Sequence, residues 1–341
     1  MNSSLQTETA ALPAGILNAF EPSAERVRFL DQRMRSRLAD SLRYILSEAN
    51  GLLDVPQNPF QEFLSGLERG PVSPLAFSHY NDIVFAIEED DLGEASRLFG
   101  ELISLPPHPG GPIISELGDP SRDSVARRYA RFLSEDASVK FEVFPPSREA
   151  AYACRRQIKD AFALMDAGDP ALASEIRALL REIILAAGAQ IKNTYTFDGA
   201  SAFMLWGGII LNASRREGEL TMVQMLAHES AHNLVFGLSA DEPLVENPPE
   251  ELFSSPLRLD PRPMEGIYHA TFVTARMHRA VKRLLESGIL SPSLEENAQK
   301  EIAENARLFA KGIQTVLRHG KLTPLGQSIM AGAKAYMDSA A

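Results

Sequence analysis

Residues 228–232 are His-Glu-Ser-Ala-His, the H-E-x-x-H pattern, and no other stretch constrains the fold of this chain as strongly. Two histidines four residues apart project from one face of an α-helix, where they can bind one metal ion. The pattern therefore requires a helix, which we expect over 220–237. It also predicts that His228 and His232 are metal ligands and that Glu229 has a catalytic role beside them.

Hydrophobic periodicity predicts that most of the remaining chain is helical as well. The helical segments are expected at 23–50, 59–68, 74–88, 91–104, 121–134, 148–167, 170–187, 261–287, 292–318 and 323–338. Strand-like patterns occupy 139–144 and 189–212, and Gly237 is the expected end of the metal-binding helix. We therefore expect an α+β fold, predominantly α-helical, with a small antiparallel sheet beside the H-E-x-x-H helix.

A stretch rich in proline and glycine, LPPHPGGP at 105–112, predicts a boundary within the chain. With 341 residues the protein can form one large domain or two smaller ones. We expect a helical N-terminal region over 1–104, which carries no recognisable motif. A metal-binding catalytic domain with the H-E-x-x-H helix is expected over 113–341.

Composition argues against several classes of partner. The formal net charge is −11, from 34 basic and 45 acidic residues, which disfavours general attraction to nucleic acid or to an anionic membrane. No apolar run reaches the roughly 18 residues of a membrane span, and the N-terminus lacks the pattern of a secretory signal. A cytoplasmic location is the expectation.

The single cysteine, Cys154, excludes an internal disulfide and a cysteine-rich zinc site. It is expected to be packed in a helix.

A metal site needs a third ligand, and His269 is the best candidate. On the helix predicted over 261–287, His269, Glu265 and Arg276 lie along one edge of an apolar stripe. His278 points to the opposite side of that helix and is expected to be exposed. An acidic third ligand remains an alternative, with Glu265 or Glu246 in that role.

One possible activity is that of a zinc metallopeptidase. In such an enzyme Glu229 would deprotonate a zinc-bound water, and a further His or Glu would complete the site. The metzincin extension of the motif is missing, because Val235 and Leu238 occupy the positions that need Gly and His. The peptidase hypothesis therefore lacks a distinctive third ligand.

A second possible activity is that of a non-haem iron oxygenase. Three protein ligands would leave open positions for a 2-oxo acid and O₂, and an arginine would bind the far carboxylate of that co-substrate. His228, His232 and His269 provide the ligands, and Arg276 or Arg262 is the candidate anchor. A third hypothesis is a metal-stabilised peptide-binding module without catalysis.

Three segments also carry a resemblance to a known family. HESAHNLVFG, then SPLRLDPRPMEGIYHATFVTARM, then LTPLGQSIM resemble the 2-oxoglutarate-dependent H-E-x-x-H-type peptide β-hydroxylases, over about 190–335. The resemblance implies Fe(II) and 2-oxoglutarate as cofactors. It also implies hydroxylation of a side-chain β-carbon in a ribosomally made precursor peptide or an amino acid, in natural-product biosynthesis. It carries the ligand roles to His228, His232 and His269, and makes Glu229 a group near the substrate rather than a general base.

Overall fold

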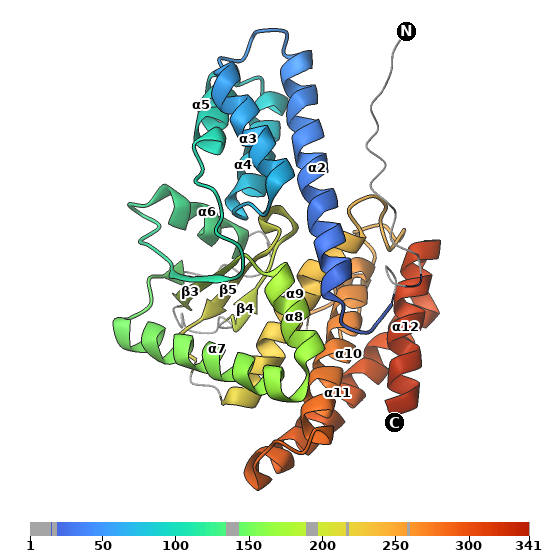
Figure 1. Cartoon of the computed structure of the whole chain (residues 1–341). Helices are drawn as coiled ribbons and strands as arrows, with labels where there is room; N and C mark the ends of the chain where they lie inside the picture. Colours follow the sequence, from blue (N-terminus) through green and yellow to red (C-terminus); the bar gives the residue numbers. More distant parts are fainter. Residues whose placement is uncertain are drawn as a thin grey trace.

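The computed structural model describes residues 15, 19–133, 143–188, 197–215, 218–257 and 260–340, and they form a predominantly helical α+β fold, as the sequence predicts (Figure 1). The α-helices are α2 (Ala24–Glu48), α3 (Gln57–Arg69), α4 (Leu75–Glu88), α5 (Leu92–Ile103), α6 (Ser124–Leu133), α7 (Arg148–Gly168), α8 (Pro170–Leu179), α9 (Glu219–Leu238), α10 (Met264–Glu286), α11 (Pro292–His319) and α12 (Pro324–Ala340). A short 3₁₀ helix, η1 (Phe203–Leu205), precedes the last strand of the main sheet.

The main sheet is small and mixed. Its strands are β1 (Ile113–Glu116), β2 (Val143–Phe144), β3 (Glu182–Gly188), β4 (Gly199–Ala200) and β5 (Gly208–Asn212). β3 pairs in parallel with β1 on one side and with β5 on the other, so that Ile183 lies opposite both Ile114 and Ile209. Antiparallel pairing occurs between β4 and β5, between β2 and β3, and in the separate pair β6 (Leu252–Phe253) and β7 (Arg262–Pro263).

One predicted helix was too long, because its second half forms the central strand. We expected a helix over 170–187, but α8 ends at Leu179 and β3 begins at Glu182. Ile183 and Leu185 on one face of β3, and Ile184 and Ala186 on the other, are all buried. A strand covered on both faces has a continuous apolar run, which periodicity does not separate from a buried helix.

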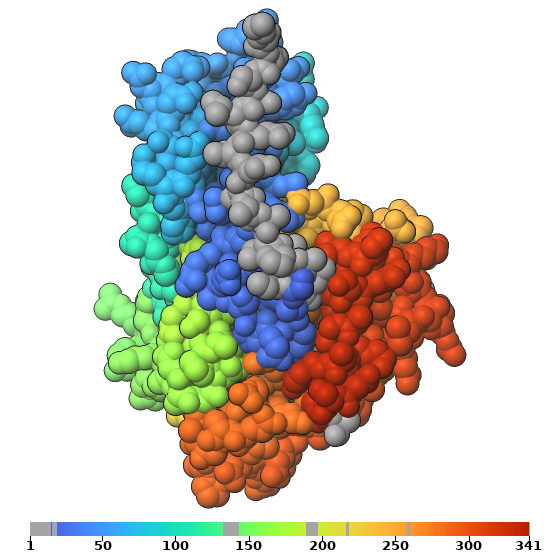
Figure 2. All heavy atoms as spheres, turned by 45° about the vertical axis from the view of Figure 1, so that its right-hand side comes forward, coloured from blue at the N-terminus to red at the C-terminus, as the bar shows by residue number. Residues whose placement is uncertain are grey.

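The N-terminal helices share their core with the rest of the chain. Helix α2 begins as predicted, with the Ser23 hydroxyl accepting from the Arg26 N–H. One apolar cluster contains Leu30 and Phe99 together with Leu234 and Phe272, which lie beyond the Pro- and Gly-rich segment. That segment therefore separates two stretches of sequence but not two cores. Figure 2 shows α12 (red) beside the first residues of α2 (dark blue), where Phe20 stacks on Tyr336.

The H-E-x-x-H helix, α9, lies in the centre of the molecule, packed against α10, α7, α8 and α2 and touching β4 and β5. Gly237 was expected to end this helix, but the helix continues to Leu238. A Cβ at Gly237 would lie 2.5 Å from Cη2 of Trp206, so the glycine allows close packing rather than termination.

The described helices include none that is long and apolar enough to cross a membrane.

Candidate metal site

The three predicted histidine ligands meet between α9 and α10. His228 Nε2 lies 3.2 Å from His232 Nε2, and His232 Nδ1 lies 3.2 Å from His269 Nδ1. The His228 and His232 rings come from adjacent turns of α9, and His269 comes from the second turn of α10. The tertiary structure therefore places His269 where the sequence predicted it, against the H-E-x-x-H pair.

All three rings are neutral at physiological pH, which is the form that binds metals. Burial lowers the pKa of His228 and of His269 to about 4. Burial, and after it the two neighbouring rings, lower the pKa of His232 well below its usual value. On its other side, His228 Nδ1 contacts Met277 Sδ at 3.2 Å.

The His228 and His232 pair has the spacing of two ligands on one ion. Two nitrogens each about 2.1 Å from a metal, at angles of about 90–110°, lie about 3.0–3.4 Å apart, and the Nε2 atoms are 3.2 Å apart. His269 instead approaches the opposite nitrogen of the His232 ring. As they stand, no three His, Cys, Asp or Glu side chains of the described residues converge on one point. A shared ion would therefore need one of the rings, His232 or His269, to turn.

Glu229 lies beside the histidines, on the side of the sheet. Its carboxyl is buried, and Oε2 accepts a hydrogen bond of 2.8 Å from the Ser201 hydroxyl. Burial raises the pKa of Glu229 to about 7, against the effect of that hydrogen bond, and Asp198 adds to the rise. Gly199 of β4 passes close by, since a Cβ there would lie 2.7 Å from Glu229 Oε1. The group is therefore positioned to hold or release a proton near neutral pH.

A cavity of about 290 Å³ opens beside His269. Its wall comes from η1, the C-terminal end of α9, the following loop and the start of α10: Phe203, Ser239, Pro243, Leu244, Val245, Glu265, Tyr268 and His269. Phe236 of α9 packs against two of these residues, 5.3 Å from His269 and 6.2 Å from Phe203 between ring centres. The cavity offers room for a small organic molecule or side chain next to the candidate ligands.

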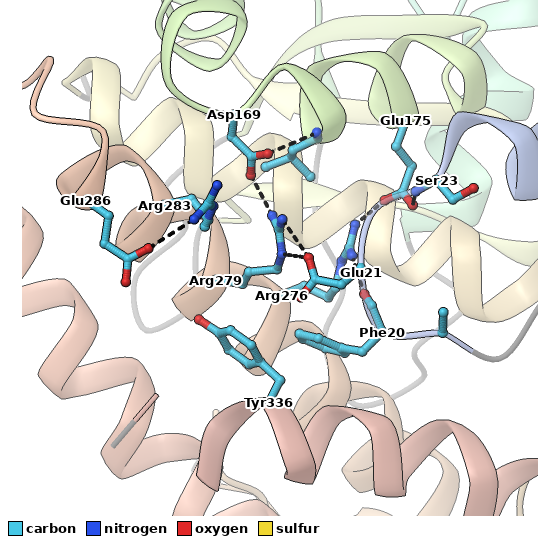
Figure 3. Close-up of polar contacts among 12 residues, drawn as sticks. Phe20, Glu21, Ser23, Asp169, Glu175, Arg276, Arg279, Arg283, Glu286 and Tyr336 are labelled. Carbon is cyan, nitrogen blue, oxygen red and sulfur yellow. Dashed lines mark hydrogen bonds and ion pairs between the residues drawn. The ribbon is translucent and has the colours of Figure 1, made fainter. Parts of the chain in front are cut away.

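Arg276 does not line this cavity, although the sequence made it a candidate carboxylate anchor. Its guanidinium is 2 % exposed, forms an ion pair with Glu175 and donates to the Phe20 carbonyl at 2.8 Å. Glu175 also binds Arg26 and accepts from the Ser23 N–H, which joins the start of α2 to α8 and α10. Figure 3 shows Glu175 between Ser23 and Arg276. Arg276 therefore binds a carboxylate of the protein itself, because the tertiary structure places α8 against this edge of α10.

The other candidates from the sequence have varied positions. Arg262 lies in β7, immediately before α10, with Nη1 3.3 Å from Asp260. Glu265 lines the cavity, whereas the backbone N–H of Glu246 binds the Lys321 carbonyl at 2.7 Å. His278 was expected to be exposed and is buried instead, since α12 covers that face of α10 and Tyr336 contacts His278 Nδ1 at 2.9 Å.

Sequence reasoning missed Ser201 and Gly199, which hold the Glu229 carboxyl. Both lie within the strand-like stretch 189–212, and that pattern gave no indication that these residues would meet α9. Met277 is a further residue that sequence reasoning missed, although its Sδ contacts His228. Cys154, by contrast, is buried in α7 as expected.

The comparisons with known proteins add no relative: no protein-family model matches the chain, and no curated protein matches its sequence.

Proposed function

We propose that this protein is an Fe(II)- and 2-oxoglutarate-dependent oxygenase that hydroxylates a side-chain β-carbon of a peptide or amino-acid substrate. The observation that carries the proposal is the meeting of His228, His232 and His269, the last of which lines a cavity of about 290 Å³. A metal with three protein ligands and an adjoining cavity has the open positions that such chemistry requires. The resemblance of the H-E-x-x-H helix and the later segments to the peptide β-hydroxylases supports the same activity.

In this proposal His228 and His232 hold the ion, and His269 completes the set once a ring has turned. When bound, Fe(II) would supply the activation of O₂, coupled to the conversion of 2-oxoglutarate into succinate and CO₂. His269 is buried and His228 and His232 are half-buried, which limits the access of water to the proposed reacting centre. Arg262 is the remaining candidate for the carboxylate anchor, because Arg276 is engaged by Glu175. The Ser201 hydroxyl donates to the Glu229 carboxyl and fixes it next to the histidine pair.

A zinc hydrolase is the second candidate, and two observations favour it. Glu229 is buried next to the histidine pair with its pKa raised to about 7, as suits a general base that takes a proton from water. Among the described residues that line the cavity there is also no arginine to bind a 2-oxo acid.

The two activities are separated by the metal and by the chemistry that follows. Anaerobic protein with Fe(II) and 2-oxoglutarate is expected to show the weak visible charge-transfer band of a chelated 2-oxo acid. His228→Ala should abolish the band, and admission of O₂ to wild-type protein should yield succinate. His319→Ala, at an exposed histidine on α11, serves as the matched control and should leave both readouts unchanged.

A different outcome would favour the hydrolase. Absence of the band, together with cleavage of a peptide library by zinc-loaded protein that Glu229→Gln abolishes, would overturn the oxygenase proposal. If the metal stabilises the protein but neither succinate formation nor peptide cleavage is detected, the protein is a binding module without catalysis.

A further inference from the structure

A second, larger cavity lies away from the histidines, where the N-terminal helices meet α6 and β2. Its volume is about 710 Å³, within the range of about 300–1,000 Å³ typical of ligand sites. Asp82 of α4 and Glu101 of α5 form one wall, and α6 and β2 form the others. Figure 1 shows α6 between the N-terminal helices and the sheet, on the opposite side of the view from α12.

The wall formed by α6 is cationic. Arg127, Arg128 and Arg131 line the cavity from one turn of this helix. Arg128 and Arg131 both pair with Asp82, so two guanidiniums share that carboxylate. Burial, and then the neighbouring Arg131, lower the pKa of Arg128 to about 10, so the group stays charged at neutral pH.

Arg127 is the most available of these groups. It is exposed, and its Nε donates to the Pro120 carbonyl at 3.0 Å. Within the described part of the chain, its two terminal nitrogens have no protein acceptor. A fourth arginine in the wall, Arg97, is already matched by Glu94 and Glu101. The cationic character therefore comes from α6, in a chain whose net charge is −11.

The facing wall is apolar and belongs to a strand edge. Val143 and Phe144 of β2 line the cavity, and the Phe144 side chain is 44 % exposed. Among the described strands, β2 pairs only with β3, so its other edge has no strand partner. A strand edge offers main-chain hydrogen bonds to an extended peptide, and arginines bind carboxylates strongly.

We propose that this cavity binds an extended acidic peptide segment, with its carboxylates on the arginines of α6 and its apolar side chains against Phe144. The strand edge and the exposed aromatic ring favour a peptide over a small inorganic anion, which would use the arginines alone. Nucleic acid is a poor fit, because three of the four arginines among the described residues of the cavity wall lie on the single helix α6, in a protein with a net charge of −11. The proposal does not depend on the metal site or its chemistry.

The test is fluorescence anisotropy of the metal-free full chain with a fluorescein-labelled peptide of alternating glutamate and leucine. Saturable binding is expected, and the affinity should weaken as NaCl is raised from 50 to 500 mM. Arg127→Glu should raise the Kd at least tenfold. Phe144→Ser should raise the Kd severalfold, which a purely ionic site would not show. Circular dichroism will confirm that each variant is folded.

Two controls make the outcome decisive. Arg307→Glu reverses an exposed charge on α11, outside the cavity, and should leave the Kd unchanged. A lysine–leucine peptide should not bind. The proposal is overturned if Arg127→Glu and Arg307→Glu weaken binding equally, if the acidic peptide does not bind, or if 1 mM inorganic phosphate displaces it completely. Because the assay requires neither metal nor turnover, its failure would say nothing against the proposed oxygenase.

Discussion

Glu175 is the carboxylate that two buried arginines share, and its replacement by glutamine should measure how strongly this network holds α2, α8 and α10 together. Oε2 accepts from Arg26 Nη2 at 2.7 Å and from the Ser23 N–H at 2.7 Å, while Oε1 pairs with Arg276. Glutamine preserves the size of the side chain but removes its charge. Two buried guanidiniums would then lack their counter-charge.

The expected loss of stability follows from this burial. Removing one partner of a buried ion pair costs about 3–5 kcal/mol, because the remaining charge is left uncompensated in the interior. At about 2.1 cal/mol/K per residue, the entropy of unfolding of a 341-residue chain is about 0.7 kcal/mol/K. Glu175→Gln should therefore lower the Tm by about 4–7 °C.

Differential scanning calorimetry at pH 7 measures this shift. The matched control is Glu296→Gln, which breaks an exposed pair with Lys300 on α11 and should change the Tm by less than about 1 °C. Burial would raise the pKa of Glu175, but Arg276 and Arg26 outweigh it and lower the pKa. The stabilisation is therefore present above the unfolded pKa of about 4.3 and is lost as pH falls through the lower folded pKa, so the two proteins should converge in acid.

Two results would refute this reasoning. A Tm for Glu175→Gln within about 1 °C of wild type would mean that the network does not stabilise the fold. The triple variant Arg26→Met, Glu175→Leu, Arg276→Met removes all three charges and should recover most of the lost Tm. If it is no more stable than Glu175→Gln, unpaired charge is not the cause of the loss.

Three further predictions follow from close packing and from protonation. Gly237→Ala places a Cβ 2.5 Å from Trp206. Overpacking of this kind costs about 1–3 kcal/mol, which should lower the Tm by about 1–4 °C in calorimetry. An unchanged Tm would contradict the close approach. Gly199→Ala places a Cβ 2.7 Å from Glu229 Oε1 and should reduce turnover at least tenfold while metal affinity, measured by titration, stays the same. Burial, and next its cationic neighbours, lower the pKa of His79 to about 4. Between pH 6.5 and 4 the unfolded chain therefore binds more protons than the folded protein. The free energy of unfolding should fall by up to about 1.4 kcal/mol for each unit by which the pH is lowered through that window. Urea unfolding of His79→Leu should show a shallower acid slope, and an identical slope would exclude this group.

Local patterns predicted much of the helical framework and singled out the three histidines that meet between α9 and α10. The helix that carries His228 and His232 depends on spacing within one segment, and the position of His269 beside the apolar stripe of α10 required only helical geometry. The same geometry put Arg276 on that edge, and the structure agrees. Helical periodicity does not predict which segment packs against each turn of that edge. The ion pair between Arg276 and Glu175 could therefore not be predicted.

The sequence by itself determined which residues can share a face, because helical geometry is a property of the chain over a few residues. Only the tertiary structure decided what covers each face. In the tertiary structure Glu175 pairs with Arg276, and α12 covers His278. The Trp206 ring packs closely against Gly237. It also made 182–188 a central strand rather than helix. In each case the deciding contact comes from a segment distant in sequence, and the burial and pairing of such contacts outweigh local propensity.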